Sequence, residues 1–180
     1  EVDMIQFLGA GFEEVDNRTL SLILVQEGMT NAVVFDANGN VRQPAELLYK
    51  KAVLMERGSF QPVNNVHLDM LECAQKRFAE VQGISERDTL VLFELNLSTF
   101  GSDEEIDLAD FLARVDALTA LGQTVLISNY FEFYRLSAYF RRHTTSPIGI
   151  VLGISNLANI FNENYYDHLE GGIRESLGRL

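Results

Sequence analysis

The feature that most constrains this chain is a short apolar run, Thr124–Ile127, in which polar and apolar residues do not alternate. An amphipathic stretch that ends at Gly122 precedes the run, and an aromatic stretch follows Asn129. Unbroken runs of this kind are typical of strands in a parallel sheet that helices cover on both faces. The pattern therefore predicts a buried strand between two helices, with Ser128 and Asn129 at its carboxyl end.

The same alternation of apolar runs and helical patterns extends along the whole chain. The other predicted strands are Met4–Leu8, Ala32–Phe35, Ala52–Met55, Thr89–Leu95 and Ile148–Leu152. The predicted helices are Arg18–Gln26, Ala45–Tyr49, a long helix from the Asn64 cap to Gly83, one that follows a Ser102/Glu105 capping box, Phe131–Arg142, and Ser155–Arg179 with a break near Gly171. Strands that alternate with helices predict right-handed βαβ units.

This alternation predicts an α/β fold with three layers, doubly wound and Rossmann-like, around a mostly parallel sheet of about six strands. Without an internal repeat or a linker, residues 1–180 are predicted to form a single domain. The chain begins at Glu1 without a methionine and stops inside a predicted helix, so we expect it to be a fragment of a longer protein.

The charge of the chain is acidic, at −12 with a pI near 4.6. Nucleic acids and anionic membranes require clustered Lys and Arg, so neither is expected as a partner. No apolar run approaches the ~18 residues of a membrane-spanning helix. Cys73 is the single cysteine, which excludes an intramolecular disulfide and favours a reducing compartment. We therefore predict a soluble cytoplasmic protein.

Polar side chains follow several of the predicted strands where they end. The ligand crevice of open α/β sheets lies at the strand carboxyl ends. The Arg57 guanidinium can donate two parallel hydrogen bonds to one anionic group, and Ser59 precedes a helix whose free N-terminal amides favour an anion. The alternative is that Arg57 pairs with Glu94 of a neighbouring strand; Glu94 is also a candidate general base if it is desolvated. The predicted ligand-binding residues are Arg57, Ser59, Asn96, Ser128, Asn129 and Asn156.

Cofactor and metal signals are weak in this sequence. Gly9-Ala10-Gly11 begins like a dinucleotide-binding turn, but Glu14 holds the third glycine position, and a plain turn is the alternative. His67, His143 and His168 lack metal-ligand spacing, so no metal site is predicted. His67 comes early in a helix, where a surface or capping role is common. No cofactor is assigned.

The segment Asp36-Ala-Asn-Gly-Asn-Val41 resembles the first motif of haloacid-dehalogenase-type phosphatases, and the strand that ends in Ser128 resembles the second. The resemblance implies that Asp36 is a nucleophile and Ser128 a phosphate ligand. Asn38 stands where that family has its general acid, and no acidic pair follows Ile148–Leu152 to hold magnesium. The alternative is that Asn38-Gly39 forms a hairpin turn.

Residues 47–70 and 107–152 are similar to a bacterial family labelled nicotinate-nucleotide adenylyltransferase. That activity needs a His-x-Gly-His motif, and no histidine of this chain stands in one. The resemblance therefore implies a bacterial source and transfers no site residue.

Aromatic residues over Tyr130–Phe140 spread over more than one face of the predicted helix, so we expect some to be exposed. With Tyr165-Tyr166 they predict self-association or contact with a missing part of the chain; a fully covered helix is the alternative. The leading functional prediction is a domain that binds a small polar or phosphorylated ligand at the strand ends. The alternative is a non-catalytic oligomerisation or assembly module. Whether the protein is an enzyme is left open.

Overall fold

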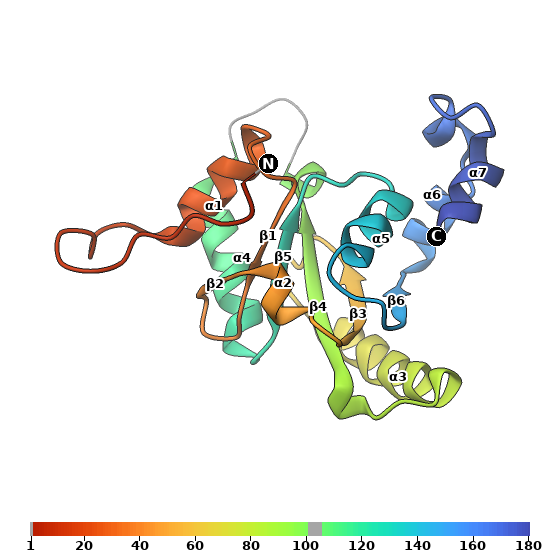
Figure 1. The fold of residues 1–180 in the computed structure, drawn as a ribbon, viewed down its shortest axis with the longest axis horizontal. Helices are drawn as coiled ribbons and strands as arrows, with labels where there is room; N and C mark the ends of the chain where they lie inside the picture. The colour runs from red at the N-terminus through yellow and green to blue at the C-terminus, as the bar shows by residue number, and fades with distance from the viewer. Residues whose placement is uncertain (1, 101–105) are drawn as a thin grey trace.

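One mixed sheet of six strands, in the order β2-β1-β5-β4-β3-β6, organises the computed structural model, which describes residues 2–100 and 106–180 (Figure 1). The strands β3 (Ala52–Arg57), β4 (Thr89–Asn96), β5 (Thr124–Ser128) and β6 (Ile148–Val151) are parallel. At the other edge, β1 (Ala32–Phe35) runs antiparallel to β5 and forms a hairpin with β2 (Val41–Arg42). The prediction of a mostly parallel α/β sheet is confirmed.

Helices cover both faces of the sheet and make three layers. One face packs against α1 (Asn17–Gln26), α3 (Asn65–Gln82) and α4 (Leu108–Ala120), which bury Leu22, Leu71 and Phe111. The other face packs against α2 (Pro44–Leu47) and α5 (Phe133–Arg141), which lie on the side of Leu126 and Met55. Two apolar clusters, one on each face, give the buried strands their unbroken apolar sequences.

Capping residues fix the ends of α3 as the sequence predicts. The Asn64 side chain accepts from the amides of Val66 and His67, and Gly83 ends the helix in a left-handed conformation with φ 64°. The His67 ring completes the capping box, because its Nδ1 accepts from the Asn64 amide at 3.1 Å. This geometry positions the first turn of α3 beside the end of β3.

The predicted strand Met4–Leu8 is wrong, since residues 2–8 have no regular secondary structure. The sheet edge next to β1 is occupied by β2 instead. Leu8 is 72% exposed, and the Phe7 amide and carbonyl bond to the side chain of Asn17 and not to a neighbouring strand. A short apolar run looks the same in sequence whether or not it finds a partner strand.

The C-terminal region departs from its predicted helix. It consists of α6 (Ile154–Ile160), a 3₁₀ turn η3 (Glu163–Tyr166) and α7 (Gly172–Arg179), so the first break comes well before Gly171. Figure 1 shows α6 and α7 beyond α5 and β6, at the right of the view. The Ser102/Glu105 capping box lies outside the described residues, and Asp107 caps α4.

The expectation that aromatic side chains around α5 are exposed is wrong for all but one of them. Phe131 is 49% exposed, whereas the buried ones are Tyr130, Phe133, Tyr134, Tyr139 and Phe140. Four of these residues, Tyr130, Phe133, Tyr139 and Phe140, belong to the apolar cluster on the sheet. The Tyr134 side of the helix faces α7: the Arg179 guanidinium is 5.7 Å from the Tyr134 ring centroid, and the Ser137 hydroxyl donates to the Leu180 carbonyl at 3.2 Å. The alternative of a covered helix applies. Among the described residues, no helix has the length and apolar character needed to cross a membrane.

Candidate functional site

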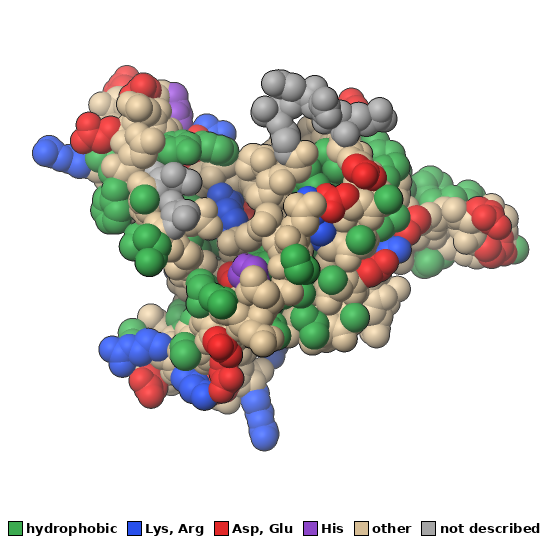
Figure 2. Space-filling view, turned by 180° about the vertical axis from the view of Figure 1, so that it is seen from behind, with side chains coloured by type: hydrophobic (Ala, Val, Ile, Leu, Met, Phe, Trp, Pro, Cys, Tyr) green, Lys and Arg blue, Asp and Glu red, His purple; other side chains and the backbone are tan. Residues whose placement is uncertain are grey.

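A cavity of about 560 Å³ lies over the carboxyl ends of the parallel strands. The start of α3, the segment before α5 and the residues after β6 surround it. Figure 2 shows the corresponding face hollowed between the lobe of α3 and the lobe of α6 and α7. Its size is that of a small-molecule site, and its position is the one that open α/β sheets use for ligands.

Arg57 ends β3 and is held by an ion pair with Glu94. Its Nε and Nη2 donate to the two Glu94 carboxylate oxygens at 2.6 and 2.8 Å; the Glu94 side chain is fully buried and that of Arg57 is 10% exposed. Nη2 and Nη1 also donate to the carbonyls of Tyr130 and Phe131, at 2.8 and 2.7 Å. These contacts use four of the five guanidinium N–H groups. The pairing with Glu94, considered from the sequence as the alternative to ligand binding, is present.

The ends of β4 and β5 join the same network. The Ser128 hydroxyl donates to Glu94 Oε1, and Asn96 Nδ2 donates to the Tyr130 carbonyl at 2.7 Å and to Ser128 Oγ at 3.4 Å. Asn96 Oδ1 accepts from the Ser98 amide at 3.0 Å. The sequence-predicted residues Arg57, Glu94, Asn96 and Ser128 therefore lie together, and their bonds fix the segment that leads into α5.

The remaining predicted residues are distributed differently. Ser59 and Asn156 line the cavity, and Asn156 Nδ2 lies 3.4 Å from the Arg57 carbonyl. Asn129 is exposed and its amide donates to the Asn31 carbonyl at 3.0 Å; it is outside the described lining.

Asp36, the other predicted catalytic candidate, does not lie at the carboxyl ends of the parallel strands, where Ser128 lies, but at their opposite ends. This follows because β1 is antiparallel to β5, which pairs Phe35 with Val125 at the start of β5. The Asp36 carboxylate accepts from the amides of Asn38 and Asn40, at 2.9 and 3.0 Å, and so shapes the hairpin turn. The structure does not bring Asp36 and Ser128 together.

Glu56 is a cavity residue that sequence reasoning missed. It precedes Arg57 on β3 and points to the other face, where its strand neighbours are Phe93 and Val151. It is 2% exposed, and its Oε2 has no hydrogen-bond partner within the described structure. Burial raises the pKa of the Glu56 carboxyl from 4.5 to about 7. A buried carboxylate without a partner is rare and points to a functional site.

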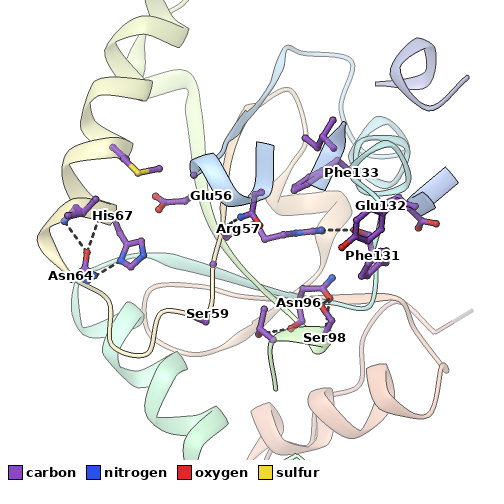
Figure 3. Close-up of a pocket in the computed structure, with 18 of the residues that line it drawn as sticks. Glu56, Arg57, Ser59, Asn64, His67, Asn96, Ser98, Phe131, Glu132 and Phe133 are labelled. Atoms are coloured by element: carbon purple, nitrogen blue, oxygen red, sulfur yellow. Dashed lines mark hydrogen bonds between the residues drawn. The ribbon is translucent and has the colours of Figure 1, made fainter. Parts of the chain in front are cut away.

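His67 is the second missed residue, because a capping histidine gives no separate sequence signal for a cavity. Its ring packs edge-on against Phe60, with centroids 5.2 Å apart, and burial lowers its pKa. The imidazole is therefore neutral near pH 7, and since Nδ1 accepts from Asn64, the proton is assigned to Nε2. Figure 3 shows Glu56 and His67 on one side of the cavity, while Arg57 extends away from them toward Glu132 and Phe133.

The loop between β3 and α3 has an unusual backbone at Phe60. Its φ of 47° is in the left-handed region, which bulky residues rarely adopt. A Cβ at Gly58 would lie 2.8 Å from the Phe60 ring, so only glycine fits under it. The buried Phe60 ring packs edge-on against Phe93, with the ring centroids 5.0 Å apart, and holds the loop on the sheet. Strained backbone of this kind often occurs beside ligand sites.

Comparisons with protein-family models, curated proteins and solved structures found no match, so the account of this site rests on its geometry. Within residues 2–100 and 106–180, no group of three His, Cys, Asp or Glu side chains is arranged to hold a metal ion. What the described lining offers is hydrogen-bonding side chains opposite an aromatic wall of Phe131, Phe133, Tyr165 and Tyr166.

Proposed function

We propose that this domain binds a small polar organic ligand in the cavity at the strand carboxyl ends. The observation that carries the proposal is the convergence there of polar groups from separate elements, namely Glu56 from β3, His67 from α3, Asn96 from β4 and Asn156 from α6. Few convergent polar groups on a mainly apolar wall are typical of small-molecule sites.

The lining favours a ligand without a phosphate. Arg57 is the only Lys or Arg among the described lining residues, and most of its N–H groups already bond to Glu94 and to backbone carbonyls. A phosphorylated ligand would have to break these bonds and leave Glu94 buried without its partner, which is costly. An uncharged or cationic ligand avoids that cost.

The experiment is a thermal-shift screen of amines, polyols, amino acids and sugar phosphates. A ligand at about 100 times its Kd adds about 2.7 kcal/mol to the free energy of unfolding. The test variant is Gly153→Leu: Gly153 lines the cavity, its φ is not positive, and a Cβ there meets nothing within 4 Å. We expect this variant to fold and to lose the ligand-induced shift, because the new side chain occupies cavity space.

The matched control is Lys76→Ala on the exposed side of α3, which should keep the shift. The proposal fails if no compound in the panel stabilises the protein, or if Gly153→Leu responds to each active compound as the unmodified protein does.

A second candidate function, self-association, is favoured by a separate observation. Ile154 and Leu157 of α6 and Phe161, the residue directly after it, are all exposed and follow helical spacing. We propose that a second copy of this chain covers them. Light scattering on a size-exclusion column should show a dimer that Leu157→Asp converts to a monomer; a monomer at all concentrations would contradict this candidate.

A further inference from the structure

We infer that the cavity selects a small organic cation, a protonated amine on an apolar or aromatic frame, and that Glu56 is the residue that binds its N–H groups. The inference rests on the proposed function and names the ligand class for the same cavity.

The first step is the hydrogen-bonding state of Glu56. A carboxylate can accept several hydrogen bonds, yet Glu56 Oε2 is buried without any partner in the described structure. The residue lies among Phe93, Val151 and Leu54 on the α3 side of the sheet, and none of these three side chains can donate a hydrogen bond. An orphan acceptor of this kind destabilises the empty protein, and a ligand that donates to it relieves the cost.

The second step is the charge of the cavity. The titratable side chains that line it with Glu56 are Arg57, His67, Glu132, Tyr165 and Tyr166. The positive charge of Arg57 is matched by Glu94, and His67 is neutral. Glu132 has Arg135 Nε and His168 Nε2 each at 3.3 Å. Within the described lining, Glu56 is thus the one carboxylate without a counter-charge.

The third step is the wall opposite Glu56. Phe131 and Tyr165 stack with their ring centroids 5.0 Å apart, and the Arg57 guanidinium already lies 4.2 Å from the Phe133 centroid. Aromatic faces attract cations and pack against hydrocarbon. Glu56 attracts a positive group and the rings accommodate its frame, whereas an anion would meet an uncompensated carboxylate.

This arrangement has a pH signature. An ammonium group binds the ionised form of Glu56, so binding requires loss of the carboxyl proton. Because the pKa of Glu56 is raised to about 7 in the empty protein, affinity should increase with pH up to neutrality and then level off until the amine itself loses its proton. Binding near pH 6 should release a proton.

The test uses three probes that share one ring and differ in charge: benzylammonium, benzyl alcohol and benzoate. Calorimetry at pH 8 should rank them in that order of affinity. Glu56→Gln should weaken benzylammonium by about 10- to 100-fold, the range that a lost hydrogen bond to a charged group gives, and should abolish the pH dependence. The matched control, Glu72→Gln on the exposed side of α3, should change neither.

The outcomes separate the two proposals. Benzoate or benzyl alcohol that binds at least as tightly as benzylammonium, and loses binding in Gly153→Leu, would overturn the cation inference and support the cavity. Failure of all three probes at millimolar concentration would overturn the cation inference alone, because the proposed function is decided by the wider thermal-shift panel. If Glu56→Gln does not fold, the pH dependence and proton release of the unmodified protein decide, and benzylammonium binding that is equal at pH 5.5 and 8 would overturn the inference.

Discussion

Glu56 and Arg57 are neighbours on β3, yet they represent opposite states of a buried charge. Arg57 turns toward α5 and is bonded to Glu94 and to two backbone carbonyls. Glu56 turns toward α3, among apolar side chains, with one oxygen that has no partner in the described structure. The alternation of side chains along a strand produces this difference between adjacent residues.

The comparison separates two roles that the sequence does not distinguish. A charge whose bonds are satisfied inside the protein holds the structure, while a charge whose bonds are not satisfied is available to a ligand or costs stability. By this criterion Arg57, one of the ligand-binding residues predicted from the sequence, is a structural residue, and Glu56 is the proposed ligand contact.

The largest expected effect is that of Arg57→Ala. It leaves Glu94 buried without its partner, and we expect the free energy of unfolding to fall by about 3 to 5 kcal/mol in urea titrations. Arg57→Met combined with Glu94→Leu should cost less than Arg57→Ala alone, since no charge is then left unpaired. A loss of under about 1 kcal/mol in Arg57→Ala would show that the pair contributes little.

The next effect concerns Glu56 and depends on pH. The pKa of its carboxyl is about 7 in the folded chain, against the ordinary value of 4.5. Between pH 4.5 and pH 7 the folded state therefore keeps a proton on Glu56 that the unfolded state has lost. Glu56 therefore favours folding below about pH 4.5, and about 3 kcal/mol of that contribution is lost as the pH rises to 7.

Glu56→Gln cannot titrate, so it should gain stability relative to the unmodified protein between pH 5 and 8 in urea unfolding. If the two proteins differ in free energy of unfolding by the same amount at pH 5 and at pH 8, the raised pKa of Glu56 is contradicted.

A smaller effect is expected for Asn96→Ala. The change removes the acceptor of the Ser98 amide and one of the two donors to the Tyr130 carbonyl, which keeps its bond from Arg57 Nη2. The cost should be about 1 to 3 kcal/mol by chemical denaturation. Asn129→Ala, on an exposed residue of the same region, should stay within about 0.5 kcal/mol; equal losses in the two variants would argue against the network.

The smallest effect is that of Lys76→Ala. Lys76 Nζ lies 2.6 Å from Glu72 Oε1, but both side chains are solvent-exposed, so water replaces the contact. We expect no measurable change in the melting temperature, in contrast to the buried Arg57 pair. A decrease as large as that of Arg57→Ala would mean that burial does not decide the strength of these pairs.

Local sequence signals are sufficient for most of the fold. Unbroken apolar runs mark β3, β4 and β5, and the Asn64 and Gly83 caps mark α3, because these features depend on neighbouring residues alone. The packing of α7 on α5 is a contact between distant segments and leaves no periodic signal, which is why the burial of Tyr134 was not foreseen.

The candidate site is less readable from sequence. The sequence predicts the pairing of Arg57 with Glu94 as one of two alternatives, because both residues lie at the carboxyl ends of neighbouring parallel strands. Glu56 was missed because the predicted strand stopped at Met55, whereas β3 continues to Arg57. One further residue of strand places the Glu56 side chain on the apolar face instead of in a loop.

The most direct test of this account is the pKa of the Glu56 carboxyl, measured by ¹³C NMR titration with Glu56→Gln to assign the signal. A midpoint near 7 that falls when benzylammonium is added is the expected result, because the carboxylate is buried without a partner and a cation supplies one. A midpoint near 4.5, unchanged by benzylammonium, would mean that Glu56 is solvated or already paired and would contradict its proposed role.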